Sequence, residues 1–193
     1  MLILASASPR RQELLRNAGI EFIVQPSDIP EIPLPGELPQ IFAERVAREK
    51  ARTVHQRRPG NYVLGADTVV IVDDHILNKP GDVQDAARML RLLSGRSHLV
   101  TTAACLVGPD SGKNSGVFED VRSETTLVVF NSLSDRDIQN YLASGEPMDK
   151  AGAYGIQGLA SRWIPRVEGC YFNVVGLPVA LVYRMLREHA VMR

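Results

Sequence analysis

The sequence has few cysteines, few aromatic residues and no excess of charge of either sign. Of its 193 residues, two are cysteines and 6% are aromatic. Cys105 and Cys170 lie far apart and neither belongs to a C-x-x-C motif, which argues against a zinc or dithiol site and is typical of thiols in a reducing compartment. Basic and acidic residues both number 22, so no overall field draws the chain to nucleic acid or to an anionic membrane. Any anion that binds must be held by a local cluster.

Long hydrophobic runs are also missing. The apolar start at residues 1–5 is short, lacks a preceding basic region and is soon interrupted by Pro9, Arg10 and Arg11, unlike a signal peptide. No stretch approaches the roughly 18 uncharged apolar residues that a membrane span requires. A chain of this length can bury a core without disulfides or a structural metal. We therefore expect a soluble, cytoplasmic protein with neither a membrane nor a nucleic acid as its partner.

Apolar periodicity predicts alternating strands and helices. Strands are expected at residues 2–5, 21–25, 63–72, 98–107, 117–130 and 162–167, and helices at 9–18, 39–54, 82–93, 134–142 and 178–187. A proline-rich loop is expected between the second strand and the second helix, and a glycine-rich loop at 145–158. The strands on either side of residues 108–116 predict a hairpin. This order indicates an α/β fold with a mixed sheet.

A candidate anion site lies where the first strand meets the first helix. Ser6, Ser8, Arg10 and Arg11 all fall within this junction. Free N–H groups and the positive end of the helix dipole favour an anion there, and hydroxyls and guanidinium groups are suited to phosphate. The simpler alternative is a capped surface helix with solvated arginines.

Asp67 stands inside an otherwise uncharged, apolar strand. A carboxylate in that position must be paired, hydrogen-bonded or bound to a metal, because its burial alone would be prohibitive. Glu31, Lys50 and Lys79 are individually typical of solvated side chains. Together with Asp67 and Arg11, they would supply oxygen ligands for Mg²⁺ or Mn²⁺ and cations for phosphate. The alternative for Asp67 is a carboxylate that caps a neighbouring loop.

The glycine-rich segment 144–158 contains Gln157 among several charged residues. Its glycines allow the backbone to approach a ligand closely, and the Gln157 amide offers both a donor and an acceptor to a base edge. A flexible surface turn is the alternative. Residues 173–178 form another turn before a helix, most simply a packing junction.

In this order, the motifs strongly resemble those of the Maf family of nucleotide pyrophosphatases, formerly described as septum-formation inhibitors. The resemblance runs over essentially the whole chain. Its motifs are S-A-S-P-R-R-Q-E-L-L at 6–15, A-R-E-K-A at 47–51, G-A-D-T-V-V at 65–70, N-K-P at 78–80, L-S-G-R-S-H at 93–98, S-G-E-P-M-D-K-A-G-A-Y-G-I-Q-G at 144–158 and N-V-V-G-L-P at 173–178.

The resemblance implies one domain over residues 1–193, in which two α/β lobes share a long curved mixed sheet with the substrate cleft between them. This arrangement is similar to that of the inosine triphosphate pyrophosphatases. The resemblance also makes Asp67 the proton acceptor and Glu31 an acid that helps it hold a divalent metal, Mg²⁺ or Mn²⁺. The positions that match the family's phosphate-binding groups are Ser6, Ser8, Arg11, Lys50 and Lys79.

Three positions separate the subgroups of this family. Arg10, Thr68 and Gln157 resemble the subgroup that acts on dTTP and UTP, whereas the 7-methyl-GTP subgroup tends to carry tryptophan and glutamine at the first two. A tryptophan can stack on a methylated, cationic purine, which Arg10 cannot do. The Gln157 amide suits the imide edge that thymine and uracil share. We therefore expect hydrolysis of dTTP and UTP to the monophosphate and diphosphate, by a protein that the resemblance suggests is a homodimer.

Two alternatives remain open at this point. One is a pyrophosphatase for 7-methyl-GTP, inosine or other modified nucleotides. The other is a non-enzymatic regulator of cell division that acts through protein contacts, as the older family name suggests. The second does not account for an acid within a central strand.

Overall fold

The computed structural model describes residues 1–109 and 116–192. The strands are β1 (Leu2–Leu4), β2 (Ile23–Val24), β3 (Tyr62–Val72), β4 (His75–Leu77), β5 (Ser97–Pro109), β6 (Val117–Val129) and β7 (Arg166–Glu168). The α-helices are α1 (Pro9–Asn17), α2 (Pro39–Arg57), α3 (Val83–Leu93), α4 (Asp135–Ala143), α5 (Tyr171–Val175) and α6 (Val179–Glu188). Three short 3₁₀ helices are η1 (Glu146–Asp149), η2 (Ala151–Ala153) and η3 (Leu159–Trp163).

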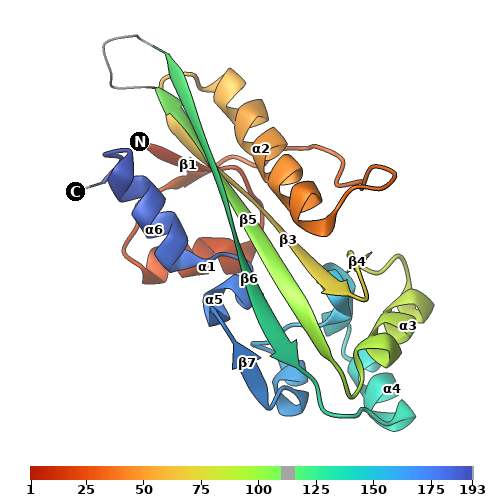
Figure 1. The fold of residues 1–193 in the computed structure, drawn as a ribbon. Coiled ribbons are helices and arrows are strands. Elements are labelled where there is room, and N and C mark those ends of the chain that lie inside the picture. Colours follow the sequence, from red (N-terminus) through yellow and green to blue (C-terminus); the bar gives the residue numbers. More distant parts are fainter. Residues whose placement is uncertain (110–115, 193) are drawn as a thin grey trace.

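The strands form one mixed sheet in the order β2-β1-β3-β5-β6-β7, and β4 pairs with the end of β3. β1 is parallel to both β2 and β3, whereas the other pairs are antiparallel. The long strands β3, β5 and β6 run through the whole molecule and connect its two ends (Figure 1). The expected α/β fold with a long mixed sheet is therefore confirmed.

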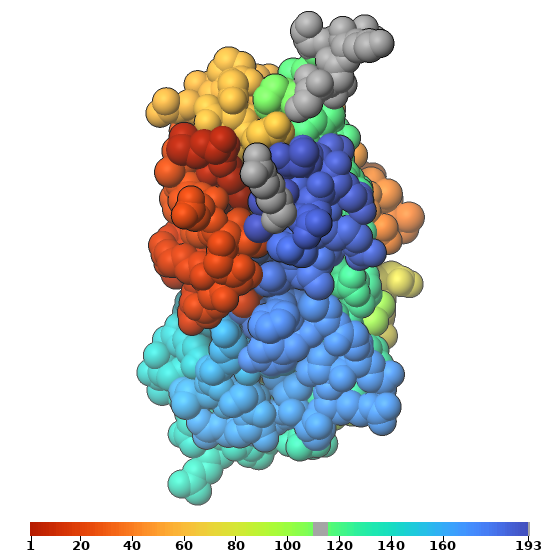
Figure 2. Space-filling model, turned by 90° about the vertical axis from the view of Figure 1, so that its left-hand side faces the viewer, coloured from red at the N-terminus to blue at the C-terminus, as the bar shows by residue number. Residues whose placement is uncertain are grey.

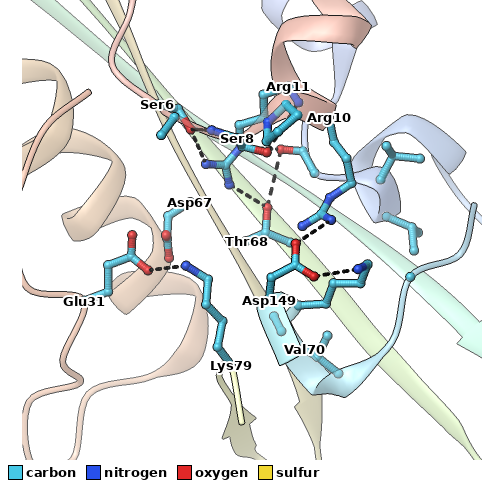
Figure 3. A pocket seen from close by; sticks show the side chains of 18 of the residues that line it. Ser6, Ser8, Arg10, Arg11, Glu31, Asp67, Thr68, Val70, Lys79 and Asp149 are labelled. Carbon is cyan, nitrogen blue, oxygen red and sulfur yellow. Dashed lines mark hydrogen bonds and ion pairs between the residues drawn. The ribbon is translucent and has the colours of Figure 1, made fainter. Parts of the chain in front are cut away.

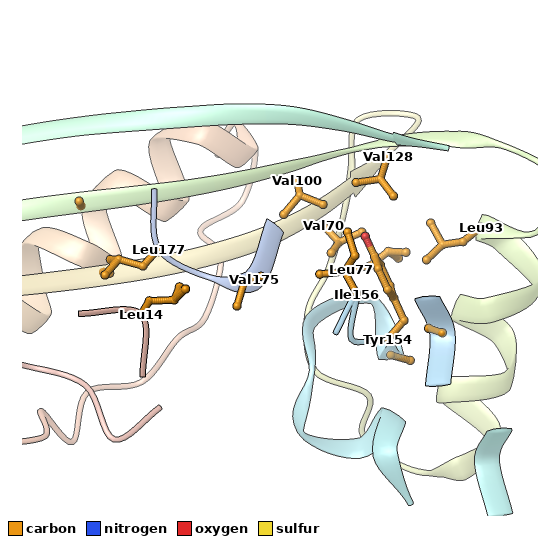
Figure 4. Close-up of a cluster of buried hydrophobic side chains, with 14 of the residues drawn as sticks. Leu14, Val70, Leu77, Leu93, Val100, Val128, Tyr154, Ile156, Val175 and Leu177 are labelled. Carbon is orange, nitrogen blue, oxygen red and sulfur yellow. The ribbon is translucent and has the colours of Figure 1, made fainter. Parts of the chain in front are cut away.

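Helices cover both faces of this sheet. α2 packs on one face, where Phe42 and Val46 meet Val63 and Val69 of β3 in a buried cluster. The larger buried cluster on the other face combines side chains of α1, α3, α4 and α6 with alternate residues of the same strands. Figure 4 shows part of this cluster, including Val70. Since successive strand residues point to opposite faces, β3 contributes to both cores.

Helix boundaries follow the capping residues. The Ser8 side chain accepts a hydrogen bond from the backbone N–H of Arg11 at the start of α1. At α4, Ser134 and Asp137 form a reciprocal capping box. Both satisfy backbone N–H groups that have no partner within the helix. These features confirm the predicted starts of the two helices.

α2 lies unusually close to β3 at Gly65. A Cβ atom at this position would lie 2.2 Å from the Ala47 carbonyl oxygen and 2.8 Å from the Ala51 backbone nitrogen. Only glycine permits this approach. The close packing places Lys50 of α2 directly beside Asp67 of β3.

One edge of β3 is paired at its two ends but not between them. β1 pairs with it as far as Leu64, and β4 pairs with it from Val70. Among the described residues, no strand pairs with this edge between those two positions. Asp67 and Thr68 lie in this interval, so both reach the open edge although they point to opposite faces of the sheet.

Several local predictions need correction. The strand expected at 162–167 is wrong over its first part, because η3 extends to Trp163 and β7 begins only at Arg166. Half of the glycine-rich segment 145–158 is 3₁₀ helix rather than loop, and β4 and α5 were not predicted. β5 and β6 pair antiparallel, as in the expected hairpin, and residues 110–115 of the turn expected at 108–116 lie outside the described residues. The expectation of one domain over residues 1–193 stays a prediction.

Within residues 1–109 and 116–192, no helix has both the length and the apolar character needed to cross a membrane.

Candidate active site

A cavity of about 690 Å³ opens at the unpaired edge of β3. It lies where α1 and the segment around residue 150 meet on one side of the molecule (Figure 2). All of the predicted site residues line it, namely Ser6, Ser8, Arg10, Arg11, Glu31, Lys50, Asp67, Thr68, Lys79 and Gln157. The structure therefore brings together residues from five separate motifs.

Arg11 is buried at the start of α1 and held by the protein on three sides. Its Nε donates to the Gly176 carbonyl oxygen at 2.8 Å, one Nη to Ser6 Oγ at 3.1 Å and the other to Thr68 Oγ1 at 3.0 Å. Burial lowers the pKa of Arg11, and the negative charges of Asp67 and Glu31 oppose that effect. A guanidinium remains charged under these conditions. Arg11 thus provides a fixed positive charge beside the N–H groups of a helix start.

Lys50 bridges two carboxylates on the opposite side of the cavity. Its Nζ lies 2.8 Å from Asp67 Oδ1 and 2.6 Å from Glu31 Oε1, and its side chain is almost completely buried. Lys79 approaches Glu31 from the outside at 3.8 Å (Figure 3). Two acids and two lysines therefore form one charged cluster.

The two acids differ in their proton affinity. Burial raises the pKa of Asp67 above its usual range, although Lys50 and Arg11 act in the opposite direction. Burial would also raise the pKa of Glu31, but Lys50, Lys79 and Arg11 outweigh it and lower that pKa. Asp67 is consequently the better proton acceptor of the two.

Glu31 and Asp67 also offer suitable oxygen ligands for a divalent metal. No group of three or more histidine, cysteine, aspartate or glutamate side chains at metal-binding distance occurs within residues 1–109 and 116–192. Mg²⁺, however, is usually held by one or two carboxylates together with substrate phosphates. The two carboxylates converge on Lys50 Nζ, which shows that a cation is favoured between them. The donor set thus fits a metal that arrives with a phosphorylated ligand.

Arg10 reaches across the cavity instead of pointing into solvent. Its Nη1 donates to Asp149 Oδ2 of η1 at 3.1 Å, and the two side chains point toward one another in Figure 3. Asp149 also contacts Lys150 at 2.6 Å. This ion pair joins the first helix to the glycine-rich segment, a contact that sequence reasoning missed.

Gln157 lies on a turn that Glu146 fixes from behind. Glu146 Oε1 accepts from the Tyr141 hydroxyl at 2.8 Å, and Oε2 accepts from the Leu159 N–H at 3.0 Å. A Cβ atom on Gly158 would lie 2.2 Å from Glu146 Oε1, so a larger residue there would displace this carboxylate. The glycines of this segment predicted a close approach of the backbone to a ligand. The close approach seen at Gly158 is to the Glu146 side chain.

Thr68 occupies the cavity wall with its hydroxyl already engaged. Besides the bond from Arg11, Thr68 Oγ1 lies 2.9 Å from Thr102 Oγ1. Its expected part in substrate specificity stays a prediction, and the structure connects this side chain to Arg11.

The fold and the site together define an α/β protein with an anion-binding cleft built around a buried, cation-paired acid. The chain belongs to the Maf family, since the model described as Maf-like protein matches residues 1–189. This agrees with the resemblance found in the sequence motifs.

Two relatives with similar sequences carry the same name. A protein of Koribacter versatilis called dTTP/UTP pyrophosphatase is 55% identical over 191 residues, which cover 99% of this chain and 95% of that protein. A protein of the same name from Syntrophomonas wolfei is 52% identical over 183 residues, covering 95% of this chain and 94% of the relative.

Solved structures with a similar chain trace are much more distant in sequence. A nucleoside-triphosphatase, also described as a dITP/XTP pyrophosphatase, from Mycobacterium abscessus has a TM-score of 0.48 and 17% identity, covering 99% of this chain and 97% of its own. A HAM1 protein from Coxiella burnetii has a TM-score of 0.43 and 19% identity, covering 67% of this chain and 72% of its own.

Proposed function

We propose that the chain is a nucleoside triphosphate pyrophosphatase that converts dTTP and UTP to the monophosphate and diphosphate. The observation that carries this proposal is the buried Asp67 carboxylate, which faces a cleft shared with Arg11 and Lys50. The name of the relatives at about half identity over nearly the whole chain supports the same activity.

In the proposed reaction, the triphosphate lies against the start of α1. Ser6, Ser8 and Arg11 hold its oxygens, and Lys50 and Lys79 balance its charge. Asp67 accepts a proton from the water that attacks the α-phosphorus in line with the departing diphosphate. A divalent cation, Mg²⁺ or Mn²⁺, held by Glu31 and Asp67 would neutralise phosphate charge when bound.

We assign the selection of the nucleobase to the other side of the cleft. Gln157 offers its amide to the imide edge of thymine or uracil, and Glu146 fixes the turn that carries it. Arg10, drawn toward Asp149, occupies the cavity wall in place of an aromatic side chain that could stack on a purine. We further propose that the enzyme acts on free nucleotides in the cytoplasm, without nucleic acid, and as a homodimer.

A panel of nucleotides tests the proposal. Purified protein with Mg²⁺ or Mn²⁺ is given dTTP, UTP, 7-methyl-GTP and ITP, and diphosphate release is measured for each. We expect kcat/KM for dTTP and UTP to exceed the others by about tenfold or more, since a site that hydrogen-bonds one base edge leaves polar groups unpaired with another.

Two results would contradict the proposal in different ways. A roughly tenfold preference in kcat/KM for 7-methyl-GTP would overturn the roles given to Arg10 and Gln157. No diphosphate from any nucleotide would favour the division regulator that acts through protein contacts.

A further inference from the structure

We propose that Thr102 and Asn173, which do not line the cavity, position the Arg11 guanidinium for phosphate through a hydrogen-bond chain of fixed direction. The inference rests on the proposed function for the role of Arg11 in binding phosphate, but the hydrogen-bond chain itself follows from the contacts. It begins at Arg11, passes through Thr68 and Thr102, and ends at the backbone of α5.

The donors and acceptors at each contact give this hydrogen-bond chain one favoured direction. Thr102 Oγ1 lies 2.9 Å from the Asn173 carbonyl oxygen, which can only accept, so Thr102 spends its single proton there. At the 2.9 Å contact between the two threonines, the proton then comes from Thr68, whose other acceptor, the Gly176 carbonyl oxygen, lies farther away at 3.4 Å. The Thr68 oxygen is left to accept from the Arg11 guanidinium at 3.0 Å. Every member thus donates toward α5.

The end of the chain is anchored in the sheet by the Asn173 side chain. Its Nδ2 donates to the Val100 carbonyl oxygen at 2.8 Å and to Thr126 Oγ1 at 2.9 Å, while its Oδ1 accepts from the Thr102 N–H at 3.0 Å. Asn173 is completely buried, and both of its amide protons are used. A fully satisfied buried amide of this kind fixes the backbone that carries it.

The same short helix holds Arg11 a second time. Gly176, the residue that ends α5, accepts from Arg11 Nε at 2.8 Å and has a φ of 129°, a conformation that favours glycine. The Asn173 anchor therefore places two acceptors at once, its own carbonyl for the threonine chain and the Gly176 carbonyl for Arg11.

The consequence for the cleft is a pre-oriented guanidinium. Arg11 has five N–H donors, and its hydrogen bonds within the described part of the chain use three of them. The other two remain for phosphate oxygens, in the planar arrangement that favours paired contacts. Thr68 influences the reaction through this orientation of Arg11, and Thr102 and Asn173 act one step further away as positioning residues.

The test compares two threonines on the same strand. Thr102→Val removes the hydroxyl that receives the Thr68 proton, with little change in shape. Thr101→Val is the matched control, because the Thr101 hydroxyl pairs with Thr125 at 2.9 Å and, as the neighbouring residue, points to the opposite face. Thr102→Ser keeps the hydroxyl and is the rescue variant.

Activity is the first measurement. Since one hydrogen bond in the chain is lost, we expect Thr102→Val to lower kcat/KM for dTTP about fivefold to tenfold. Thr101→Val and Thr102→Ser should each stay within about twofold of the wild type, because both keep the chain intact. Equal losses in Thr102→Val and Thr101→Val would overturn the proposal.

The second measurement needs no substrate. The Arg11 Nε–H resonance is assigned by its loss in Arg11→Lys, and its exchange with solvent is followed by NMR in the free protein. We expect faster exchange in Thr102→Val only, and unchanged exchange would contradict the positioning role. If the wild type released no diphosphate, the proposed function would fail, and this measurement would still test whether the hydrogen-bond chain positions Arg11.

Discussion

An Asp67→Asn variant is expected to lose at least about 10³-fold in kcat for diphosphate release from dTTP, the range that removal of a general base produces. Asparagine keeps the shape of the side chain but cannot accept a proton from water. Lys50, Arg11 and the rest of the cavity remain in place. The loss should appear in single-turnover rates, so that slow product release does not mask it.

The same variant is expected to be at least as stable as the wild type at pH 7. Burial raises the pKa of Asp67 in the folded state. A carboxyl whose pKa is raised by folding stabilises the protein when protonated, and this stability is lost as the pH rises through the folded-state pKa. Above that pKa the ionised group is a net cost, which the neutral amide removes, and Lys50 keeps Glu31 as its partner. Urea unfolding measures the difference.

Asp120→Asn is the control, because the pKa of Asp120 is shifted in the opposite direction to that of Asp67. Asp120 lies outside the cleft and accepts from Arg122 at 2.7 Å and His189 at 3.0 Å, contacts that more than offset burial and lower its pKa. We expect this variant to keep its activity and to lose stability at pH 7. If Asp67→Asn turned over dTTP at the wild-type rate, Asp67 would have no part in the mechanism.

Lys50→Met is expected to have the second largest effect, because it damages both the charge balance and the fold. Breaking a buried ion pair from one side typically costs about 3 kcal/mol or more of unfolding free energy. Asp67 limits this cost by taking up a proton, and in doing so it ceases to be a base. We expect kcat/KM for dTTP to fall by about 10²-fold or more, since an ionised base and a phosphate-binding cation are lost together.

The pH dependence of this stability loss identifies its cause. The contribution of Lys50 requires ionised partners, so the difference in unfolding free energy between wild type and Lys50→Met should narrow as the pH falls and the two acids become protonated. Arg45→Met is the control for activity: it removes a cation of the same helix that pairs with Glu37 and Glu49 away from the cavity. A loss in Lys50→Met that is independent of pH would indicate a packing defect instead of a broken charge cluster.

The sequence predicted which residues line the cleft because their chemistry is unusual for their local setting. An acid in an apolar strand, as at Asp67, must find a partner, and paired serines and arginines at a helix start are suited to an anion. Strand and helix periodicity located most of the long elements for the same reason, namely that burial of one face leaves a repeat in the sequence. β4 and η3 are too short to leave such a repeat.

What the sequence could not predict are contacts between distant segments. Arg10 and Asp149 are separated by 139 positions, and nothing near either residue names the other. Asn173 resembled a packing junction because its partners Val100, Thr102 and Thr126 belong to strands far away in the chain. Glu146 is likewise informative only once the turn behind Gln157 has been placed.

Hydrolysis of dTTP in ¹⁸O-labelled water tests most directly the claim that the cleft presents the α-phosphorus to a water beside Asp67. The products are separated and their oxygen isotopes are determined by mass spectrometry. The account predicts that the label enters dTMP and that the diphosphate remains unlabelled. Label in the diphosphate would place the attack on the β-phosphorus and contradict the assigned geometry.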